Sequence, residues 1–257
     1  MIVTKLQGGL GNQLFQWAVS KRLSEKYNTE YYFDLSYFNT SSTGLVSKWN
    51  LEIEKLNLDF KTFQIEKMNL KSITDNFHYQ EIDNNSFLDG YWQSEKYFIE
   101  IEKLIREDLK IEKSLKNYII NKYPILNENA VSLHVRRGDY LNLQNYHPIQ
   151  TIDYYNKAYD IINDLNINVV VLSNDINWCK ENIKFDNITY IEGETNIVDL
   201  YIMSLCKHNI IANSSFSWWG AWLNENKNKK VIAPINWFGP SSTLYTGDII
   251  SEKWIKI

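Results

Sequence analysis

Short apolar runs alternate with helical patterns between residues 130 and 233, and this alternation constrains the fold more than any other feature. Strands that are joined through helices run parallel, because each helix carries the chain back across the sheet before the next strand begins. The sequence therefore predicts an α/β protein whose carboxyl-terminal part is a doubly wound parallel sheet. The expected strands are at 130–135, 169–173, 188–191, 210–212 and 231–233, and the expected helices are at 151–165, 176–183, 197–207 and 216–223.

The amino-terminal part begins with the same pattern. A β-rich run at 2–6 leads through a glycine turn into a helical pattern that ends near Asn28, and a second strand is expected at 30–34. A strand, a helix and a strand in this order start a βαβ arrangement.

The middle of the chain is less regular. Loops and short helices are expected between residues 38 and 85, followed by a helix at 94–110 with Ser94 as its N-cap. We place a domain boundary at 121–129, before the regular alternation begins. This boundary divides the chain into two domains, which cover residues 1–124 and 125–257.

Composition and spacing exclude several classes of protein. The net charge of −4 argues against a nucleic-acid-binding protein, which usually presents a basic face. The two cysteines, Cys179 and Cys206, form no disulfide framework, and no Cys/His cluster has the spacing of a zinc site. No apolar run reaches the ~18 residues of a membrane span, and a glycine turn follows the amino terminus too closely for a signal peptide. We therefore expect a cytoplasmic protein without a bound metal.

A basic motif, His-Val-Arg-Arg-Gly-Asp-Tyr at residues 134–140, closes the first strand of the carboxyl-terminal part. Side chains alternate along a strand, so His134 and Arg136 should point to one face while Arg137 points to the other. The carboxyl end of a parallel strand is where open α/β sheets bind ligands. Because a guanidinium matches two oxygens at once, Arg136 is suited to a phosphate or diphosphate.

The basic motif is also compatible with roles that involve no phosphate. An arginine of the pair could form an ion pair with a neighbouring helix. His134 could be a buried core histidine whose hydrogen bonds are satisfied. Arg-Gly-Asp is also an adhesion tripeptide, although its attachment to a buried strand argues against a protruding loop.

A glycine-rich turn, Gly-Gly-Leu-Gly-Asn-Gln at residues 8–13, lies between the first strand and the first helix. Glycines let backbone amides approach a phosphate, and the amino end of the helix adds positive potential. The turn has neither the Gly-Lys-Ser/Thr ending of a P-loop nor the spacing of a dinucleotide fingerprint. A tight turn that packs the helix closely against the sheet explains the same residues equally well.

Polar residues follow two other expected strands. Asp175 comes after one of them, and Asn213, Ser214 and Ser215 come after another. All should face the same edge as Arg136, where serine hydroxyls and amides at a helix start can bind phosphate. Asp175 has an alternative role as the N-cap of the helix that follows it. Three tryptophans of the last helix are expected in the core: Trp218, Trp219 and Trp222.

Three segments occur in one order along the chain: 8–13, 134–140, and 213–220 with the sequence Asn-Ser-Ser-Phe-Ser-Trp-Trp-Gly. Together they resemble the bacterial alpha-1,2-fucosyltransferases of glycosyltransferase family 11. The resemblance extends from residue 3 to residue 238 and includes two further segments, at 90–98 and 147–155.

The resemblance implies a GT-B-like fold with two Rossmann-like domains facing across a cleft. It implies an inverting enzyme that transfers L-fucose from GDP-β-L-fucose to the 2-hydroxyl of a terminal β-galactoside. The carboxyl-terminal domain would bind GDP-fucose and the amino-terminal domain the galactose-terminated glycan, with residues 38–85 selecting the acceptor. The interpretation includes no metal cofactor, no nucleic acid and no transmembrane segment, and it is compatible with peripheral association with the inner membrane.

The resemblance also implies roles for individual residues. Arg136 would contact the diphosphate, with His134 near the nucleotide. Asn12, together with Gly9 and Gly11, would close over the leaving group from the other domain. Guanosine and the β-phosphate would be held by Asp175, Asn213, Ser214, Ser215 and Phe216.

Transfer with inversion also needs a base for the acceptor hydroxyl. Asp139 is the nearest carboxylate in the basic motif, although it could instead orient Arg136 or Arg137; Asp34 and Glu95 are other candidates. Departure of GDP builds negative charge on the β-phosphate, which must be stabilised. Because the chain contains no Asp-x-Asp triplet for a metal, we expect Arg136 to supply the stabilising charge.

Different classes of function remain open from the residues alone. The glycine turn suits an NAD-linked or phosphoryl-transfer enzyme, or a transferase that uses another nucleotide sugar. The first two lack support, because neither the Gly-x-Gly-x-x-Gly spacing nor a Walker lysine is present. The many aromatic residues suit a sugar-binding lectin, which would bind a glycan but no nucleotide.

Overall fold

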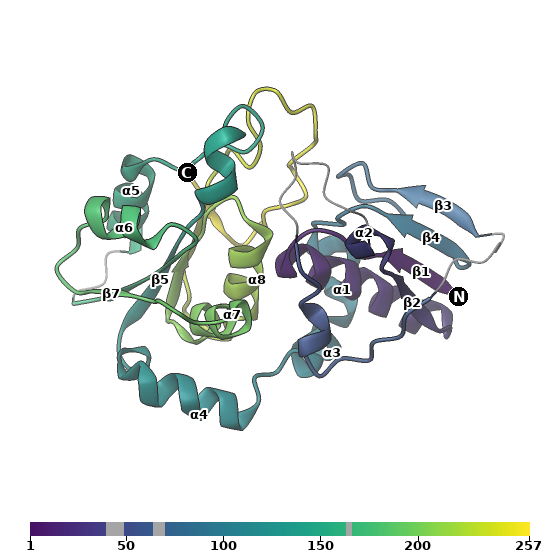
Figure 1. The fold of residues 1–257 in the computed structure, drawn as a ribbon, viewed down its shortest axis with the longest axis horizontal. Coiled ribbons are helices and arrows are strands. Elements are labelled where there is room, and N and C mark those ends of the chain that lie inside the picture. The colour runs from purple at the N-terminus through teal and green to yellow at the C-terminus, as the bar shows by residue number, and fades with distance from the viewer. Residues whose placement is uncertain (40–48, 64–69, 163–165) are drawn as a thin grey trace. The chain divides into compact units, whose positions relative to one another are not determined.

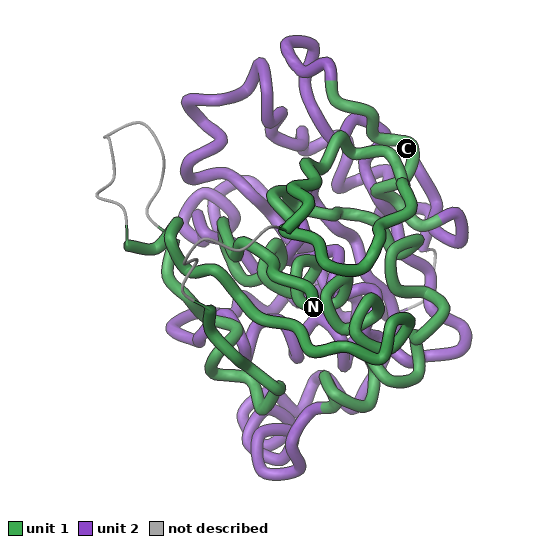
Figure 2. Tube along the Cα trace, turned by 90° about the vertical axis from the view of Figure 1, so that its right-hand side faces the viewer, with its two compact units in different colours: residues 1–110, 244–251 green, residues 111–243, 252–257 purple. Residues whose placement is uncertain are grey.

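The computed structural model describes residues 1–39, 49–63, 70–162 and 166–257 (Figure 1). The chain divides into two compact units, shown in two colours in Figure 2. Unit 1 contains Met1–Lys110 and Leu244–Ser251, and unit 2 contains Ile111–Thr243 and Glu252–Ile257. None of the described helices is long and apolar enough to cross a membrane.

Unit 1 is built on a four-stranded parallel sheet with the strand order β2-β1-β4-β3. The predicted strand–helix–strand start is confirmed, since α1 connects β1 to β2 and ends at Tyr27, with Asn28 as its left-handed C-cap. The strands are β1 (Ile2–Lys5), β2 (Tyr31–Asp34), β3 (Lys71–Thr74) and β4 (Ser86–Asp89). The helices are α1 (Leu10–Tyr27), α2 (Ser36–Asn39) and α3 (Glu102–Asp108), with 3₁₀ segments at Ile53–Lys55, Glu95–Tyr97 and Ile99–Ile101.

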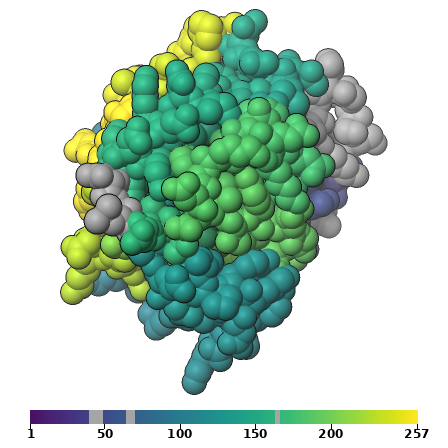
Figure 3. Space-filling model, turned by 90° about the vertical axis from the view of Figure 1, so that its left-hand side faces the viewer, coloured from purple at the N-terminus to yellow at the C-terminus, as the bar shows by residue number. Residues whose placement is uncertain are grey.

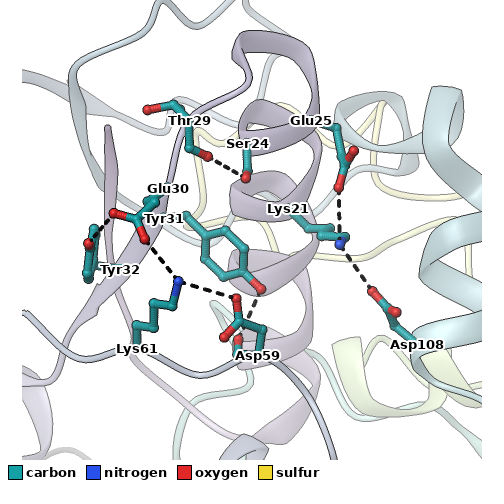
Figure 4. Close-up of polar contacts among 10 residues, drawn as sticks. All are labelled: Lys21, Ser24, Glu25, Thr29, Glu30, Tyr31, Tyr32, Asp59, Lys61 and Asp108. Atoms are coloured by element: carbon teal, nitrogen blue, oxygen red, sulfur yellow. Dashed lines mark hydrogen bonds and ion pairs between the residues drawn. The ribbon is translucent and has the colours of Figure 1, made fainter.

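Polar contacts tie the carboxyl end of α1 to β2 and to the chain beside it (Figure 4). The Ser24 hydroxyl donates to the carbonyl oxygen of Thr29 at 2.5 Å and closes the turn after the helix. The Tyr31 hydroxyl donates to the carbonyl oxygen of Asp59 at 3.0 Å, and burial raises the pKa of Tyr31 to about 12. Lys21 forms ion pairs with one carboxylate on its own helix and one on α3. These contacts hold β2 and the 59–61 stretch against α1.

Three elements of unit 1 differ from the sequence-based expectation. Strand β4 was not predicted, although its side chains alternate between buried and partly buried positions. β3 lies where only loops and short helices are expected, and its side chains are mostly exposed, so this edge strand has no apolar run that would reveal it. The helix expected at 94–110 is broken into two 3₁₀ segments and α3. Phe98 leaves the helical conformation (φ −143°, ψ 2°) and is fully buried, so the burial of its ring interrupts the helix. Ser94 caps the first 3₁₀ segment by accepting from the Lys96 amide, as predicted.

Unit 2 is built on a six-stranded parallel sheet with the order β10-β9-β8-β5-β6-β7, which confirms the predicted doubly wound pattern. The strands are β5 (Ala130–Val135), β6 (Asn168–Ser173), β7 (Ile188–Tyr190), β8 (His208–Ile210), β9 (Val231–Ala233) and β10 (Ile255–Lys256). The helices are α4 (Lys113–Lys122), α5 (Ile152–Ile162), α6 (Ile176–Asn182), α7 (Asn196–Leu205) and α8 (Ser215–Leu223), with 3₁₀ segments at Pro124–Asn127 and Gly138–Asn142. The strand expected at 210–212 begins and ends two residues earlier, as β8.

The strands of unit 2 direct alternate side chains toward two layers of helices. Val131, Leu133 and Val135 of β5 pack with Tyr155 of α5 and Cys179 of α6 in one buried cluster. The residues between them point to the other face of the sheet, because side chains alternate along a strand. The buried apolar residues of β5 therefore belong to the layer of α5 and α6.

Helices α7 and α8 cover the opposite face. Asn209 of β8 donates to the Ser132 hydroxyl at 2.7 Å and to the carbonyl oxygen of Met203 in α7 at 2.8 Å. Gly220 of α8 lies against Met203 at a point where a Cβ would collide, so the two helices approach closely. The prediction that the tryptophans of α8 belong to the core is confirmed by the burial of Trp218, Trp219 and Trp222.

The boundary between the units lies at Lys110 and Ile111 rather than at 121–129. Helix α4 belongs to unit 2 because Tyr118, Lys122 and Tyr123 all bond to the Glu194 carboxylate just before α7. Figure 3 shows α4 beside the α6–α7 part of the same unit. The chain also returns to unit 1 at 244–251, a crossing that carries no signal in the sequence.

Candidate functional site

The carboxyl ends of three neighbouring strands meet at one edge of the unit 2 sheet. Val135 at the end of β5 pairs with Ser173 at the end of β6, and Leu133 of β5 pairs with Ile210 at the end of β8. The loops that leave these strands carry the polar residues 136–140, 174–175 and 213–216. The sequence-based expectation that these groups share one edge is therefore confirmed.

Arg136 is held in place by two residues of its own motif. Its Nη2 atom lies 2.7 Å from Oδ1 of Asp139, and its guanidinium carbon lies 5.2 Å from the centre of the Tyr140 ring. The side chain is 16% exposed, so the charge is shielded from water but can still be reached. Of the two roles predicted for Asp139, base or orienting group, the geometry favours orientation of Arg136, because the carboxylate is engaged with the guanidinium.

Tyr140 connects the basic motif to the loop after β8. Its hydroxyl donates to the carbonyl oxygen of Asn213 at 3.2 Å, and the imidazole of His147 stacks on its ring with 4.6 Å between centres. Burial lowers the pKa of His147, and the Arg136 charge lowers it further, while Asp139 opposes the shift. Tyr140 thus lies between the guanidinium and the phosphate-binding turn expected at 213–216.

Arg137 points to the opposite face of β5, as strand alternation predicts. Its Nε lies 3.0 Å from Oδ2 of Asp175, and its guanidinium carbon lies 4.0 Å from the centre of the Trp178 ring. The alternative of an ion pair with a neighbouring helix therefore applies to Arg137, whose partner Asp175 is the N-cap residue of α6. Asp175 also caps α6 by accepting from the Trp178 amide at 3.4 Å, so its alternative role as an N-cap is confirmed. Its role toward a ligand stays a prediction.

His134 is buried beside the turn that begins α8. It is 5% exposed, and its ring meets the Phe216 ring edge-on at 5.7 Å between centres. Burial, with a smaller effect of the Arg136 charge, lowers the pKa of His134 to about 3, so the imidazole is neutral near pH 7. Its Nδ1 atom is buried without a hydrogen-bond partner among the described residues. The described residues thus leave Nδ1 without the hydrogen bond that a satisfied core histidine would make.

The turn at 213–216 is fixed by the side chain of Asn213, and the helix that follows it begins without a side-chain cap. The Asn213 side chain donates to the carbonyl oxygen of Trp237 and accepts from the Gln150 amide, each at 3.0 Å. Both of its polar ends are engaged, so Asn213 positions the turn. Ser214 is the N-cap residue of α8, and its side chain makes no capping hydrogen bond. The first amides of α8 and the serine hydroxyls are thus suited to an anion.

Sequence reasoning missed Asp199, which lies in the first turn of α7 after β7 and so near the same edge. Its Oδ1 atom is buried and has no hydrogen-bond partner among the residues that the structure describes. Burial, with a contribution from Glu194, raises the pKa of Asp199 to about 7. The only signal in the sequence is an acidic residue early in a helix, which is ordinary at that position.

The glycine turn of unit 1 packs closely against the first turn of α1. Gly8 has φ 76°, and a side chain there would collide with the amide of Asn12. Gly9 is the N-cap residue of α1, again with no side-chain cap, and Gly11 is buried in the first turn. Asn12 Oδ1 accepts from Nε2 of Gln93 at 2.8 Å. Close packing therefore explains the glycines, while the uncapped helix start keeps their predicted role toward a phosphate open.

The remaining candidate bases lie in unit 1. Asp34, at the end of β2, accepts hydrogen bonds from both the amide and the hydroxyl of Ser36, each at 2.9 Å. Glu95 lies in the 3₁₀ segment after Ser94. Asp34 is thus engaged in starting α2, which makes it a poor base.

The whole chain, residues 1–257, matches the model of Glycosyl transferase family 11. An Escherichia coli protein named alpha-1,2-colitosyltransferase is 34% identical, over 100% of this chain and 99% of its own length. A second Escherichia coli protein, O-antigen biosynthesis glycosyltransferase WbnK, is 28% identical over 98% of this chain and 99% of its own. A galactoside 2-alpha-L-fucosyltransferase from Caenorhabditis elegans is 30% identical over 89% of this chain and 70% of its own.

Two solved structures share the fold. The alpha-1,6-fucosyltransferase NodZ, soaked with GDP-fucose, aligns with a TM-score of 0.51 at 14% identity, over 86% of this chain and 92% of its own. The Escherichia coli ADP-heptose heptosyltransferase II aligns with a TM-score of 0.52 at 14% identity, over 100% of this chain and 89% of its own. At such identities the likeness concerns the fold alone. It confirms the predicted α/β fold of GT-B type, with two Rossmann-like units.

Proposed function

The chain belongs to glycosyltransferase family 11, and we propose that it transfers L-fucose from GDP-β-L-fucose to the 2-hydroxyl of a terminal β-galactoside, with inversion. Membership in the family confirms the resemblance drawn from the three motifs. The names of two relatives support an α-1,2 linkage, one for colitose and one for fucose on a galactoside. We also propose that the reaction takes place in the cytoplasm, where bacteria keep their nucleotide sugars.

The position of Arg136 carries this proposal. When the bond to the sugar breaks, the β-phosphate of GDP gains negative charge, and a fixed cation stabilises that charge more effectively than mobile water. Arg136 is fixed by Asp139 and by the Tyr140 ring, at the edge that also holds the uncapped start of α8. We assign the diphosphate to Arg136 and to the amides and hydroxyls of Ser214 and Ser215. Asp139 acts through Arg136 and is a positioning residue.

The base of the nucleotide is assigned to the buried polar groups at the same edge. Guanine presents two donors side by side, N1–H and the 2-amino group, and one carboxylate can accept from both. Asp199 has a buried carboxylate oxygen without a partner among the described residues, and leaving such an oxygen unpaired is costly. We therefore assign guanine recognition to Asp199, with the neutral imidazole of His134 and the ring of Phe216 nearby.

Assignment of the galactoside to unit 1 completes the proposal. Asn12, Gly9 and Gly11 at the start of α1 are proposed to approach the leaving group, as the resemblance implies. Chemistry without a metal is part of the proposal, because Arg136 would supply the positive charge that a metal supplies in other transferases.

Turnover tests the proposed function directly. Protein incubated with GDP-fucose and lactose in the presence of EDTA is expected to release GDP and to form a trisaccharide with an α-1,2 linkage. GDP release is followed by a coupled assay, and the linkage is assigned by NMR of the product. No GDP release across a panel of β-galactosides would contradict the transferase. Activity that disappears with EDTA and returns with Mn²⁺ would contradict catalysis without a metal.

GDP-colitose is a second candidate donor, favoured by the 34% identity to the named colitosyltransferase. Colitose lacks the 3-hydroxyl of fucose. A site that hydrogen-bonds this hydroxyl rejects the deoxy sugar strongly, whereas a site that is apolar there accepts both sugars. Comparison of kcat/KM for the two donors is expected to favour GDP-fucose. A preference for GDP-colitose would change the donor but not the family.

A further inference from the structure

Trp49 lies directly on the glycine turn of unit 1. Its ring atoms Cε3 and Cζ3 are 3.0 Å from the position that a Cβ on Gly9 would occupy. A side chain at residue 9 would press on the indole, which would have to shift by a few tenths of an ångström. Trp49 is partly exposed.

Gln13 holds this arrangement together. The residue is fully buried, and its Nε2 atom donates to the carbonyl oxygens of Gly8 and Asn50, each at 2.8 Å. Its Oε1 atom accepts from the amides of Glu52 at 2.9 Å and Ile53 at 3.0 Å. One side chain thus fixes the stretch that follows Trp49 onto the glycine turn. The backbone that follows Trp49 is therefore held in place before any ligand arrives, which lowers the entropic cost of binding.

A pair of side-chain amides lies at the same turn. Gln93 donates to Asn12, and this contact leaves Oε1 of Gln93 buried without a hydrogen-bond partner among the described residues. The described residues also give Nδ2 of Asn12 no acceptor. An unpaired acceptor and an unpaired donor at one place fit a hydroxyl group, which can donate to the first and accept from the second.

The charges at this edge balance one another. Lys5 at the end of β1 lies 3.2 Å from Asp89 at the end of β4, and Gln7 also donates to Asp89. An edge with an aromatic surface, two amides and a neutralised ion pair suits an uncharged polar ligand. A pyranose fits, because one face carries C–H groups that pack on an aromatic ring while its rim carries hydroxyls.

We propose that Trp49, with Gln93 and Asn12, forms the subsite for the acceptor sugar. The apolar face of the galactose packs on the indole, and a ring hydroxyl donates to Oε1 of Gln93 and accepts from Nδ2 of Asn12. This assignment rests on the proposed function, and it adds a residue that selects the acceptor. It also places that residue in the 38–85 region, where the sequence predicts acceptor choice.

Steady-state kinetics with lactose and GDP-fucose test the subsite in the full-length protein. Trp49→Leu is expected to raise the KM for lactose by roughly tenfold, which corresponds to about 1.4 kcal/mol for one aromatic contact, while leaving the KM for GDP-fucose unchanged. Trp49→Phe keeps an aromatic face and should restore most of the affinity. Gln93→Leu should raise the same KM. Tyr32→Leu removes a partly exposed aromatic elsewhere in unit 1 and should leave both KM values as in the wild type.

Two results would overturn the proposal while the transferase stands. One is an unchanged lactose KM in Trp49→Leu; the other is a higher KM for GDP-fucose alone, which would assign the subsite to the transferred sugar. Saturation-transfer NMR with methyl β-galactoside, without nucleotide, separates this proposal from the proposed function. If the wild type transfers no sugar, loss of the saturation-transfer signal in Trp49→Leu still supports a sugar subsite. Equal signals in the two proteins contradict it.

Discussion

Replacement of Arg136 by alanine is expected to lower kcat/KM by a few hundredfold. The loss corresponds to about 3–4 kcal/mol of transition-state stabilisation, the scale of one preorganised donor to a developing oxyanion. The effect should fall mainly on kcat, because the charge on the β-phosphate grows as the sugar leaves. Initial-rate kinetics with GDP-fucose and lactose measure both parameters. Arg136→Lys should recover only part of the rate, because an ammonium cannot bind two oxygens in the plane of a guanidinium.

The neighbouring arginine provides a matched control. Arg137 is the same residue type, one position later, but it points to the other face and pairs with Asp175. Arg137→Ala should therefore affect thermal stability more than kcat. Asp139→Asn weakens the ion pair that orients Arg136, and it should lower kcat without changing its pH profile, as expected for a positioning residue. Near-normal activity of Arg136→Ala, or equal losses in both arginine variants, would contradict the assigned role of Arg136.

Replacement of Asp199 by asparagine is expected to weaken GDP binding by roughly 100-fold. Loss of two hydrogen bonds to a carboxylate corresponds to about 2–3 kcal/mol, which is close to that factor in Kd. The matched ligand is inosine diphosphate, which lacks the 2-amino group of guanine. The wild type should prefer GDP to inosine diphosphate, and Asp199→Asn should lose this preference. Calorimetric titration of both nucleotides into both proteins measures the four affinities.

The same carboxyl group predicts a pH dependence. Burial raises the pKa of Asp199 to about 7, so the group is largely protonated at pH 6 and largely ionised at pH 8. Since the ionised form accepts from guanine, GDP affinity should rise by about tenfold from pH 6 to pH 8. In Asp199→Asn, the GDP affinity changes with pH only through the titration of the phosphates. The ratio of the GDP affinities of the wild type and the variant at each pH therefore reports on Asp199 alone. A ratio that does not change with pH would contradict its role in guanine binding.

The free energy of unfolding should change with pH in the direction opposite to GDP affinity. Its pKa in the folded protein lies above that of an unfolded carboxyl, so the folded protein binds the proton more tightly. The contribution of Asp199 to the free energy of unfolding therefore falls as the pH rises from about 4 to 7. Asp199→Asn removes the buried charge and should raise the melting temperature at pH 8. Stronger stabilisation with weaker GDP binding is a combination that a purely structural residue would not give.

Local patterns predicted five of the six strands of unit 2. The central strands β5 and β6 are apolar runs that are largely buried, so periodicity and turn residues define them. Strand β10, which is exposed, and helix α4 were not predicted. The exposed edge strand β3 and the break at Phe98 lacked such patterns. Both depend on neighbours that are distant in the chain: β3 on its pairing with β4, and Phe98 on a pocket that buries its ring.

Motif order and strand alternation identified the family, the ligand edge and the face on which Arg136 lies. The face of Arg136 follows from the sequence because side chains alternate along a strand, so the face of one residue gives the face of the next. Which polar atoms are engaged and which are left without a partner depended instead on packing between segments far apart in the chain. Asn213 is engaged by Gln150 and Trp237, and Arg137 by Asp175, whereas Asp199 and Gln93 each keep an oxygen without a partner among the described residues. A hydrogen bond depends on which atoms the fold brings together, so only the folded chain distinguishes a polar atom that is engaged from one that is left unpaired.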